Sequence, residues 1–203
     1  MNRRHFIGLS LGLCADIVCQ SVEASTAMDI LVLTGSPRKG GNSAILADHF
    51  IKGCREKGHR VDRFDAGLST VHPCTGCNSC GMDGSCIFDD DFSFVRERIG
   101  RADLVAFVTP MYYFGFSAQL KAVIDRFYAI NGQIHVPKKA VLMVTYADNA
   151  AKKERPLQEH YTMLLDYLGW TDAGRLIAPG VWPKGAILAT GYPEKAYQLG
   201  LSL

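Results

Sequence analysis

Three nearly continuous apolar runs most constrain the fold of this chain. They are Ile30–Thr34, Leu104–Thr109 and Ala140–Thr145, and the first two end at a glycine or a proline. Runs of this length without polar alternation are typical of strands that are buried on both faces of a parallel sheet. Parallel strands need crossover connections, so we expect helices between them.

Helical periodicity fills the intervals between these runs. The helices predicted in this way are Ser43–Lys57, Phe92–Arg101, Ser117–Tyr128, Pro156–Leu168 and Glu194–Leu201, and two further short strands are predicted at Arg60–Phe64 and Gly174–Ala178. Alternation of strands and helices favours an α/β fold with helices on both faces of the sheet. We therefore predict a flavodoxin-like doubly wound sheet of five parallel strands, formed by residues 28–203.

The first 27 residues have the pattern of an export signal. Arg3 and Arg4 precede a modest apolar stretch, Phe6–Val18, and small residues follow at Ala24–Ala27. The Arg-Arg-x-Phe-Ile segment resembles a twin-arginine signal, although Asp16 interrupts the apolar stretch. We expect a twin-arginine-type signal peptide at residues 1–27 and an exported, periplasmic protein. The alternative is that translation begins at Met28 and the protein is cytoplasmic.

The bulk composition excludes several classes of protein. The chain has 203 residues, of which 48% are hydrophobic and 21% charged, and its net charge is +2. This charge is too small to indicate a nucleic-acid partner. No apolar stretch reaches the length of about 18 residues that a membrane-spanning helix needs. We expect one globular domain without a membrane span.

The segment Gly35–Ser43 connects the first apolar run to a helix and predicts a phosphate site. Backbone N–H groups and the helix dipole favour an anion at such a place. Walker A and dinucleotide patterns are both absent, because Pro37 and Asn42 stand where these patterns need other residues. The alternative is an ordinary polar turn. The side chains suited to bind a phosphate are Ser36, Arg38, Asn42 and Ser43.

The segment after the second apolar run is unusually rich in bulky side chains. Such residues are unfavourable on a loop unless they meet a ligand or a partner, and the carboxyl ends of parallel strands are where ligands bind. A flat apolar ring would suit this segment, and a dimer contact is the alternative. The residues predicted to contact a ring are Pro110, Met111, Tyr112, Tyr113 and Phe114. Tyr146, after the third run, is a further candidate.

Four of the seven cysteines lie close together in a loop between about Ala66 and Asp90. They are Cys74, Cys77, Cys80 and Cys86, with spacings of two, two and five residues. Thiolates at these spacings can surround one metal centre, either a [4Fe–4S] cluster or zinc. Free thiols or disulfides are the other interpretations. Cys54, inside a predicted helix, is interpreted as a buried apolar residue.

These motifs together resemble a known family. The Gly35–Arg38 segment followed by Gly41–Ser43, the Pro-x-Tyr segment at Pro110–Tyr112 and the Lys121–Arg126 helix are similar to the NADPH-dependent FMN reductases. The cysteine loop resembles that of the iron–sulfur flavoproteins. The resemblance implies FMN as cofactor, NAD(P)H as cosubstrate and a homodimer or homotetramer. It also implies that Asp125 and Arg126 are structural or interface residues.

We accordingly expect an FMN-dependent NAD(P)H oxidoreductase that passes electrons to a small acceptor, such as a flavin or a quinone. In a flavoprotein the cofactor performs the redox chemistry, so no side chain is expected to act as a catalytic acid or base. The alternative is an iron–sulfur flavoprotein that transfers electrons between protein partners.

Overall fold

The computed structural model describes residues 27–150 and 152–203. Five parallel strands form one sheet in the order β2-β1-β3-β4-β5, as a flavodoxin-like fold requires. The strands are β1 (Asp29–Thr34), β2 (Arg60–Asp65), β3 (Leu104–Pro110), β4 (Lys139–Thr145) and β5 (Thr171–Ala178). The predicted fold class is confirmed.

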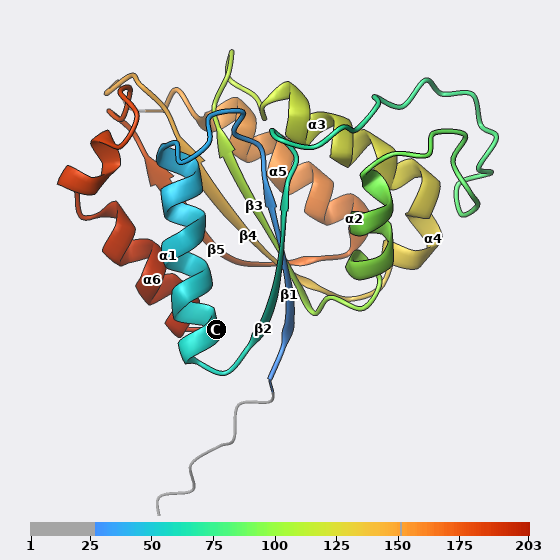
Figure 1. The fold of residues 1–203 in the computed structure, drawn as a ribbon, viewed down its shortest axis with the longest axis horizontal. Coiled ribbons are helices and arrows are strands. Elements are labelled where there is room, and N and C mark those ends of the chain that lie inside the picture. Colours follow the sequence, from blue (N-terminus) through green and yellow to red (C-terminus); the bar gives the residue numbers. More distant parts are fainter. Residues whose placement is uncertain (1–26, 151) are drawn as a thin grey trace, which may run out of the picture.

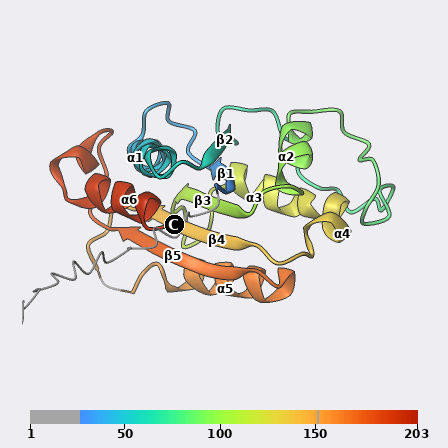
Figure 2. The same cartoon turned by 90° about the horizontal axis from the view of Figure 1, so that it is seen from below.

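Helices cover both faces of this sheet (Figures 1 and 2). They are α1 (Asn42–Glu56), α2 (Phe92–Ile99), α3 (Ala118–Asp125), the 3-10 helix η1 (Arg126–Ile130), α4 (Asn131–Ile134), α5 (Arg155–Leu168), the 3-10 helix η2 (Ala186–Ala189) and α6 (Tyr192–Leu201). The five predicted helices are present within a few residues of their expected ends. The sequence patterns missed only the two one-turn elements, α4 and η2.

Alternate residues of the central strands separate the interior into two cores. Leu31 and Leu33 of β1 pack with α2, α3 and α5, whereas Ile30 and Val32 pack with α1 and α6. Each of these four side chains is at most 2% exposed, as expected for strands that are covered on both faces. The sheet is therefore a rigid platform, and its carboxyl edge carries the loops that matter for function.

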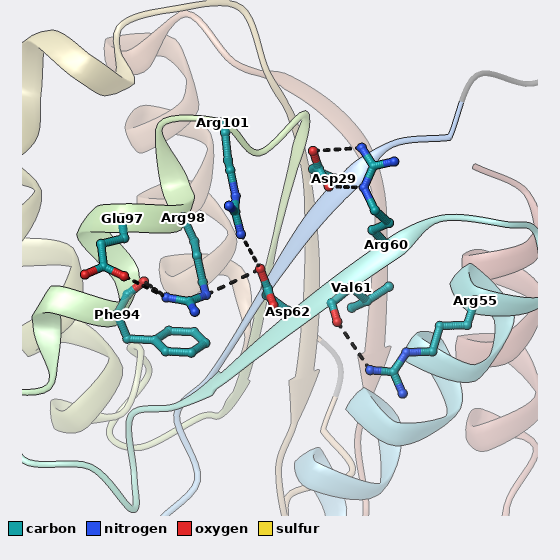
Figure 3. A network of polar contacts seen from close by, with 9 residues as sticks. All are labelled: Asp29, Arg55, Arg60, Val61, Asp62, Phe94, Glu97, Arg98 and Arg101. Carbon is teal, nitrogen blue, oxygen red and sulfur yellow. Dashed lines mark hydrogen bonds and ion pairs between the residues drawn. The ribbon is translucent and has the colours of Figure 1, made fainter.

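β2 is an edge strand, and charged side chains line it (Figure 3). Arg60 makes two hydrogen bonds to the carboxylate of Asp29 at 2.7 and 3.0 Å, and Asp62 accepts one from Arg101 at 3.1 Å. Exposed ion pairs of this kind add little stability. Charges on an edge strand do discourage pairing with another chain, so we regard this network as protection of the edge.

The predicted export signal lies outside the described residues, apart from Ala27. In the part of the chain that the structure describes, no helix has the length and apolar character needed to cross a membrane.

Candidate functional site

Backbone hydrogen bonds join the loops at the carboxyl edge of the sheet. Gly35 N–H donates to Val108 O at 2.8 Å, Met111 N–H to Thr145 O at 2.9 Å, and Tyr146 N–H to Ala178 O at 3.1 Å. Gly35 also lies close to α3, because a Cβ atom there would be 2.4 Å from Ser117 Oγ. The ends of β1, β3, β4 and β5 thus form one continuous rim.

A cleft opens on this rim, where the loops that follow β1, β3, β4 and β5 meet. The sequence predicted nine cofactor-binding residues, and seven of them line the cleft: Ser36, Arg38, Asn42, Ser43, Pro110, Met111 and Tyr112. The remaining lining residues are Thr145, Tyr146, Ala147, Val181 and Trp182. Segments that are distant in sequence therefore meet where the sequence analysis expected a ligand.

One end of the cleft is suited to an anion. Helix α1 begins there, its N-cap Gly41 has no side chain to bond the first-turn N–H groups, and no acidic residue lies in that turn. The hydroxyl of Ser36 accepts a hydrogen bond from Arg38 N–H at 3.2 Å, which shapes the loop. Among the described residues that line the cleft, Arg38 alone has a charged side chain. Unpaired N–H groups and a guanidinium can bind a phosphate.

Asn42 has a different task from the one predicted for its side chain. Its amide nitrogen donates to Val181 O at 3.0 Å and to Pro183 O at 2.8 Å, and its amide oxygen accepts from Ile187 N–H at 3.3 Å. This buried amide holds the loop after β5 against α1. The prediction that the Asn42 side chain binds phosphate is therefore corrected: only its backbone N–H, at the helix terminus, is available.

The loop after β5 contributes residues that sequence reasoning missed. The guanidinium carbon of Arg38 lies 5.4 Å from the centre of the Trp182 ring. Lys184 lies near the glycine-rich loop, because a Cβ atom on Gly40 would be 3.6 Å from Lys184 Cε. Trp182 is 64% exposed, so it forms an accessible wall of the cleft. The Trp-Pro-Lys turn directly after a strand was the available signal.

The other end of the cleft is mostly apolar. Met111 and Tyr112 approach it from the end of β3, and Tyr146 from the end of β4. The hydroxyl of Tyr146 donates to Glu154 at 2.8 Å. Burial, followed by the hydrogen bond to Glu154, raises the pKa of Tyr146 to about 12, so the phenol stays protonated at neutral pH. Tyr146, the further candidate for contact with a ring, thus lines the cleft.

Tyr113 and Phe114, which the sequence predicts beside a ring, are not among the residues that line the cleft. Tyr112 and Gly115 exchange backbone hydrogen bonds of 3.2 and 3.1 Å, and the two residues between them have φ values of 45° and 67°. This is a tight two-residue turn of a kind that usually contains Gly or Asn. It directs both aromatic side chains outward: Tyr113 is fully exposed and Phe114 is 49% exposed.

A second, small cavity lies in the cysteine loop and shares no lining residue with the cleft. All four predicted metal ligands line it: Cys74, Cys77, Cys80 and Cys86. The loop projects beyond α2, on the side of the sheet away from α1 (Figure 1). The hydrogen bond from Ser79 lowers the pKa of the Cys77 thiol, which favours a thiolate.

The arrangement of these cysteines argues against a zinc site. In residues 27–150 and 152–203, no three Cys, His, Asp or Glu side chains are close enough to hold a single metal ion. The zinc interpretation therefore has no support here. All four cysteines that line the cavity have free thiols.

A buried ion pair anchors the cysteine loop. Arg126 Nη1 donates to Asp90 Oδ2 at 2.8 Å, and both side chains are 2% exposed. The same nitrogen donates to His72 O at 3.0 Å, so both ends of the loop are held together. The structural role expected for Arg126 is confirmed. Cys54 is fully buried in α1, as predicted, and burial raises the pKa of its thiol to about 12.

Comparison with known proteins places these features in context. Residues 28–180 match the model of the family described as NADPH-dependent FMN reductase. An iron–sulfur flavoprotein of Methanosarcina thermophila is 33% identical over 99 residues, which are 49% of this chain and 52% of that protein. YwqN of Bacillus subtilis, which its name proposes to be an NAD(P)H-dependent FMN-containing oxidoreductase, is 27% identical over 77% of this chain and 87% of its own.

Solved structures give the same fold. An NAD(P)H:quinone oxidoreductase from Methanothermobacter marburgensis has a TM-score of 0.69 at 20% identity, over 87% of this chain and 96% of its own. The Trp repressor binding protein from Bacillus subtilis has a TM-score of 0.61 at 26% identity, over 84% and 98%. The chain spans about half the length of the iron–sulfur flavoproteins that it matches.

Proposed function

We propose, from the premise that this chain belongs to the NADPH-dependent FMN reductase family, that it is an FMN-dependent NAD(P)H oxidoreductase. It passes electrons from a nicotinamide nucleotide to a small acceptor. One observation carries the proposal: a single cleft combines an anion-binding helix terminus with an apolar end. The cleft lies at the carboxyl edge where β1 and β3 are neighbours, which is where this strand order binds FMN.

The residues of the cleft fit this cofactor. Ser36, Ser43 and Arg38, with the first N–H groups of α1, bind the phosphate. Pro110, Met111 and Tyr112 contact the ring, and Tyr146 closes the end of the cleft next to β4. FMN, when bound, supplies the capacity to accept a hydride and to return electrons to an acceptor. The chain itself then has to orient the ring and leave one face accessible, and no side chain is assigned as a catalytic acid or base.

Anaerobic reduction tests this function. The purified protein, loaded with FMN, is mixed with NADH or NADPH, and the flavin absorbance is followed. We expect bleaching with at least one nucleotide and recovery of the colour when a quinone is added. Failure to bleach with both nucleotides, together with rapid reduction by a ferredoxin-like donor, would replace the oxidoreductase with an electron-transfer module.

The cysteine cavity supports a second candidate function, that of an iron–sulfur flavoprotein. Four cysteines line one cavity whose wall includes the buried Arg126, and several relatives have that name. We propose that Cys74, Cys77, Cys80 and Cys86 bind a [4Fe–4S] cluster. Such a cluster would exchange single electrons with protein partners.

Chemical analysis tests the cluster separately from the oxidoreductase activity. After anaerobic reconstitution we expect iron and acid-labile sulfide near four each per chain, the composition of a [4Fe–4S] cluster. Cys77→Ala should lose most of both, and Cys54→Ala, which removes a buried thiol outside the loop, should retain them. An iron-free yellow wild-type protein would leave the cysteines as free thiols.

Assembly and location are proposed as well. We propose a homodimer or homotetramer, to which the exposed Tyr113 and Phe114 contribute apolar surface. Light scattering of the wild type and of a Tyr113→Ser/Phe114→Ser variant tests this.

We further propose that residues 1–27 direct export to the periplasm. Fractionation of cells that produce Arg3→Lys/Arg4→Lys against wild type tests this, and a protein that stays cytoplasmic in both cases would contradict it.

A further inference from the structure

Arg126 is buried at the foot of the cysteine loop, at the start of η1. It is 1% exposed, which is rare for an arginine. Its terminal nitrogens have partners: Nη1 donates to His72 O and to Asp90 Oδ2, and Nη2 lies 3.4 Å from Asp90 Oδ1. Both terminal nitrogens of the guanidinium therefore have hydrogen-bond acceptors.

The remaining donor of this guanidinium is unaccounted for. Arg126 Nε is buried, and no acceptor among the described residues lies within hydrogen-bond distance of it. A buried N–H group without an acceptor is unfavourable and uncommon in folded proteins. Arg126 is one of the residues that line the cysteine cavity, so a ligand bound there can supply the missing acceptor.

The cavity that Arg126 lines is the one formed by the four cysteines. No carboxylate is among its described lining residues, and the apolar parts of Ile87, Phe88 and Ala129 form much of the rest of the wall. The guanidinium carbon lies 5.4 Å from the ring centre of Phe88 and 4.8 Å from that of Phe92. Arg126, whose Nε–H has no partner among the described residues, is therefore among the residues that line a cavity whose expected occupant is held by negatively charged thiolates.

We propose that Arg126 sets the reduction potential of the four-cysteine centre, by donating its Nε–H hydrogen bond to a sulfur of the bound cluster. This inference rests on the proposed [4Fe–4S] cluster. Hydrogen bonds to sulfur and nearby positive charge stabilise the more negative, reduced state of such a cluster and raise its potential. Asp90 and His72 keep the guanidinium in the orientation that this contact needs.

Arg96, which lies in α2, offers a matched comparison because it also binds the cysteine loop. Its Nη1 donates to Gly84 O at 2.8 Å, so it also tethers the loop, but it does not line the cavity. If Arg126 acted only as a tether, losing either arginine would have the same kind of effect. The proposal predicts that only Arg126 affects the electron equilibrium of the centre.

The experiment compares wild type, Arg126→Lys, the charge-neutral pair Arg126→Gln/Asp90→Asn, and Arg96→Gln. Each protein is reconstituted anaerobically with iron and sulfide, and its iron content and midpoint potential are measured, the potential by an EPR-monitored redox titration. Lysine retains a positive charge without Nε, whereas the double variant removes the cation and leaves no buried carboxylate unpaired. Circular dichroism of the iron-free proteins verifies the fold.

The expected result is a lower potential in both Arg126 variants. The one-electron equilibrium should shift about tenfold towards the oxidised form, or ~59 mV, in the double variant, and less in Arg126→Lys. Arg96→Gln should match wild type.

Two results would overturn the inference, and they are distinguishable. If wild type binds four iron atoms and Arg126→Lys has the wild-type potential, the Nε contact is wrong while the proposed cluster stands. If wild type binds no iron, the cluster proposal fails and this inference fails with it.

Discussion

The flavin cleft and the cysteine cavity are built in opposite ways. The cleft rests on the ends of four strands, and backbone hydrogen bonds connect its loops, such as the bond from Val181 N–H to Tyr146 O at 2.9 Å. The cysteine cavity lies in a mostly exposed loop of more than 20 residues, in which Asn78 and Met82 have positive φ values of 59° and 70°. A few side chains of α2 and η1 hold this loop in place.

This difference indicates which of the two sites is preformed and which one needs its ligand to become ordered. Buried strands fix the cleft independently of any cofactor, because its walls are extensions of the core. The cysteine loop has little core of its own, so the Arg126–Asp90 pair and a bound metal centre have to supply its order. We expect loss of FMN to change the protein little and loss of iron to change the cysteine loop strongly.

The largest effect is expected from breaking the ion pair of the cysteine loop. Arg126→Gln leaves the Asp90 carboxylate buried without its partner, which should lower the free energy of unfolding by about 3–5 kcal/mol. Urea denaturation of the iron-free protein measures this. Arg126→Gln/Asp90→Asn should recover part of the loss. A single variant within about 1 kcal/mol of wild type would show that the pair does not anchor the loop.

The next largest effect is expected on FMN binding, at the phosphate end of the cleft. Arg38→Ala should weaken FMN binding about 10- to 100-fold, because it removes a charge-assisted hydrogen bond. Riboflavin, which has no phosphate, should bind wild type and variant equally. Fluorescence titration measures both ligands, and Arg55→Ala, at the far end of α1, is the control. Equal weakening of FMN and riboflavin would mean that Arg38 does not bind the phosphate.

A smaller effect is expected on hydrogen exchange, and it should be confined to the cysteine loop. Hydrogen exchange of residues 74–88 should accelerate about tenfold or more when iron is removed, because the loop then opens easily. Exchange of β1, β3 and β4 should be the same with and without iron. If the loop stays protected from exchange after iron is removed, it is as preorganised as the cleft, and the proposed difference between the two sites is wrong.

Local motifs explain why much of the cleft was predictable. Gly35–Ser43 and Pro110–Tyr112 follow strong strands, and their position in the fold comes from the strand order alone. Val181 and Trp182 were not predictable in the same way. Their place depends on a hydrogen bond between residues 139 positions apart, Asn42 and Val181, and no local pattern contains such a contact.

Two other features depended on packing that a sequence does not display. The outward direction of Tyr113 and Phe114 comes from positive φ values that bulky residues rarely adopt. The cysteine spacing predicted a shared centre, but the pairing of Arg126 with Asp90, 36 positions away, required the three-dimensional structure. Loops are harder to predict than strands because side chains, not a regular backbone pattern, determine their shape.

The smallest effect is a dependence on pH. Burial acts to raise the pKa of Asp90, but hydrogen bonds from Arg126 and from the N–H groups of His72 and Phe92 lower it below its usual value. Folding therefore favours the ionised carboxylate. This contribution to stability is complete above the unfolded pKa of about 4 and disappears as the pH falls through the lower, folded pKa.

In Asp90→Asn the stability should accordingly change less between about pH 5 and pH 2 than in wild type. Thermal unfolding at a series of pH values, with iron-free protein, measures this. Parallel curves for the two proteins would contradict a lowered pKa for Asp90.

We propose that one preformed cleft on the sheet edge binds a flavin by its phosphate. Calorimetric titration of the flavin-free, iron-free protein with FMN and then with riboflavin tests this binding mode. We expect one FMN per chain and at least about tenfold weaker binding of riboflavin, whether or not iron is present. Equal affinity for the two flavins, or FMN binding only after iron is restored, would contradict it.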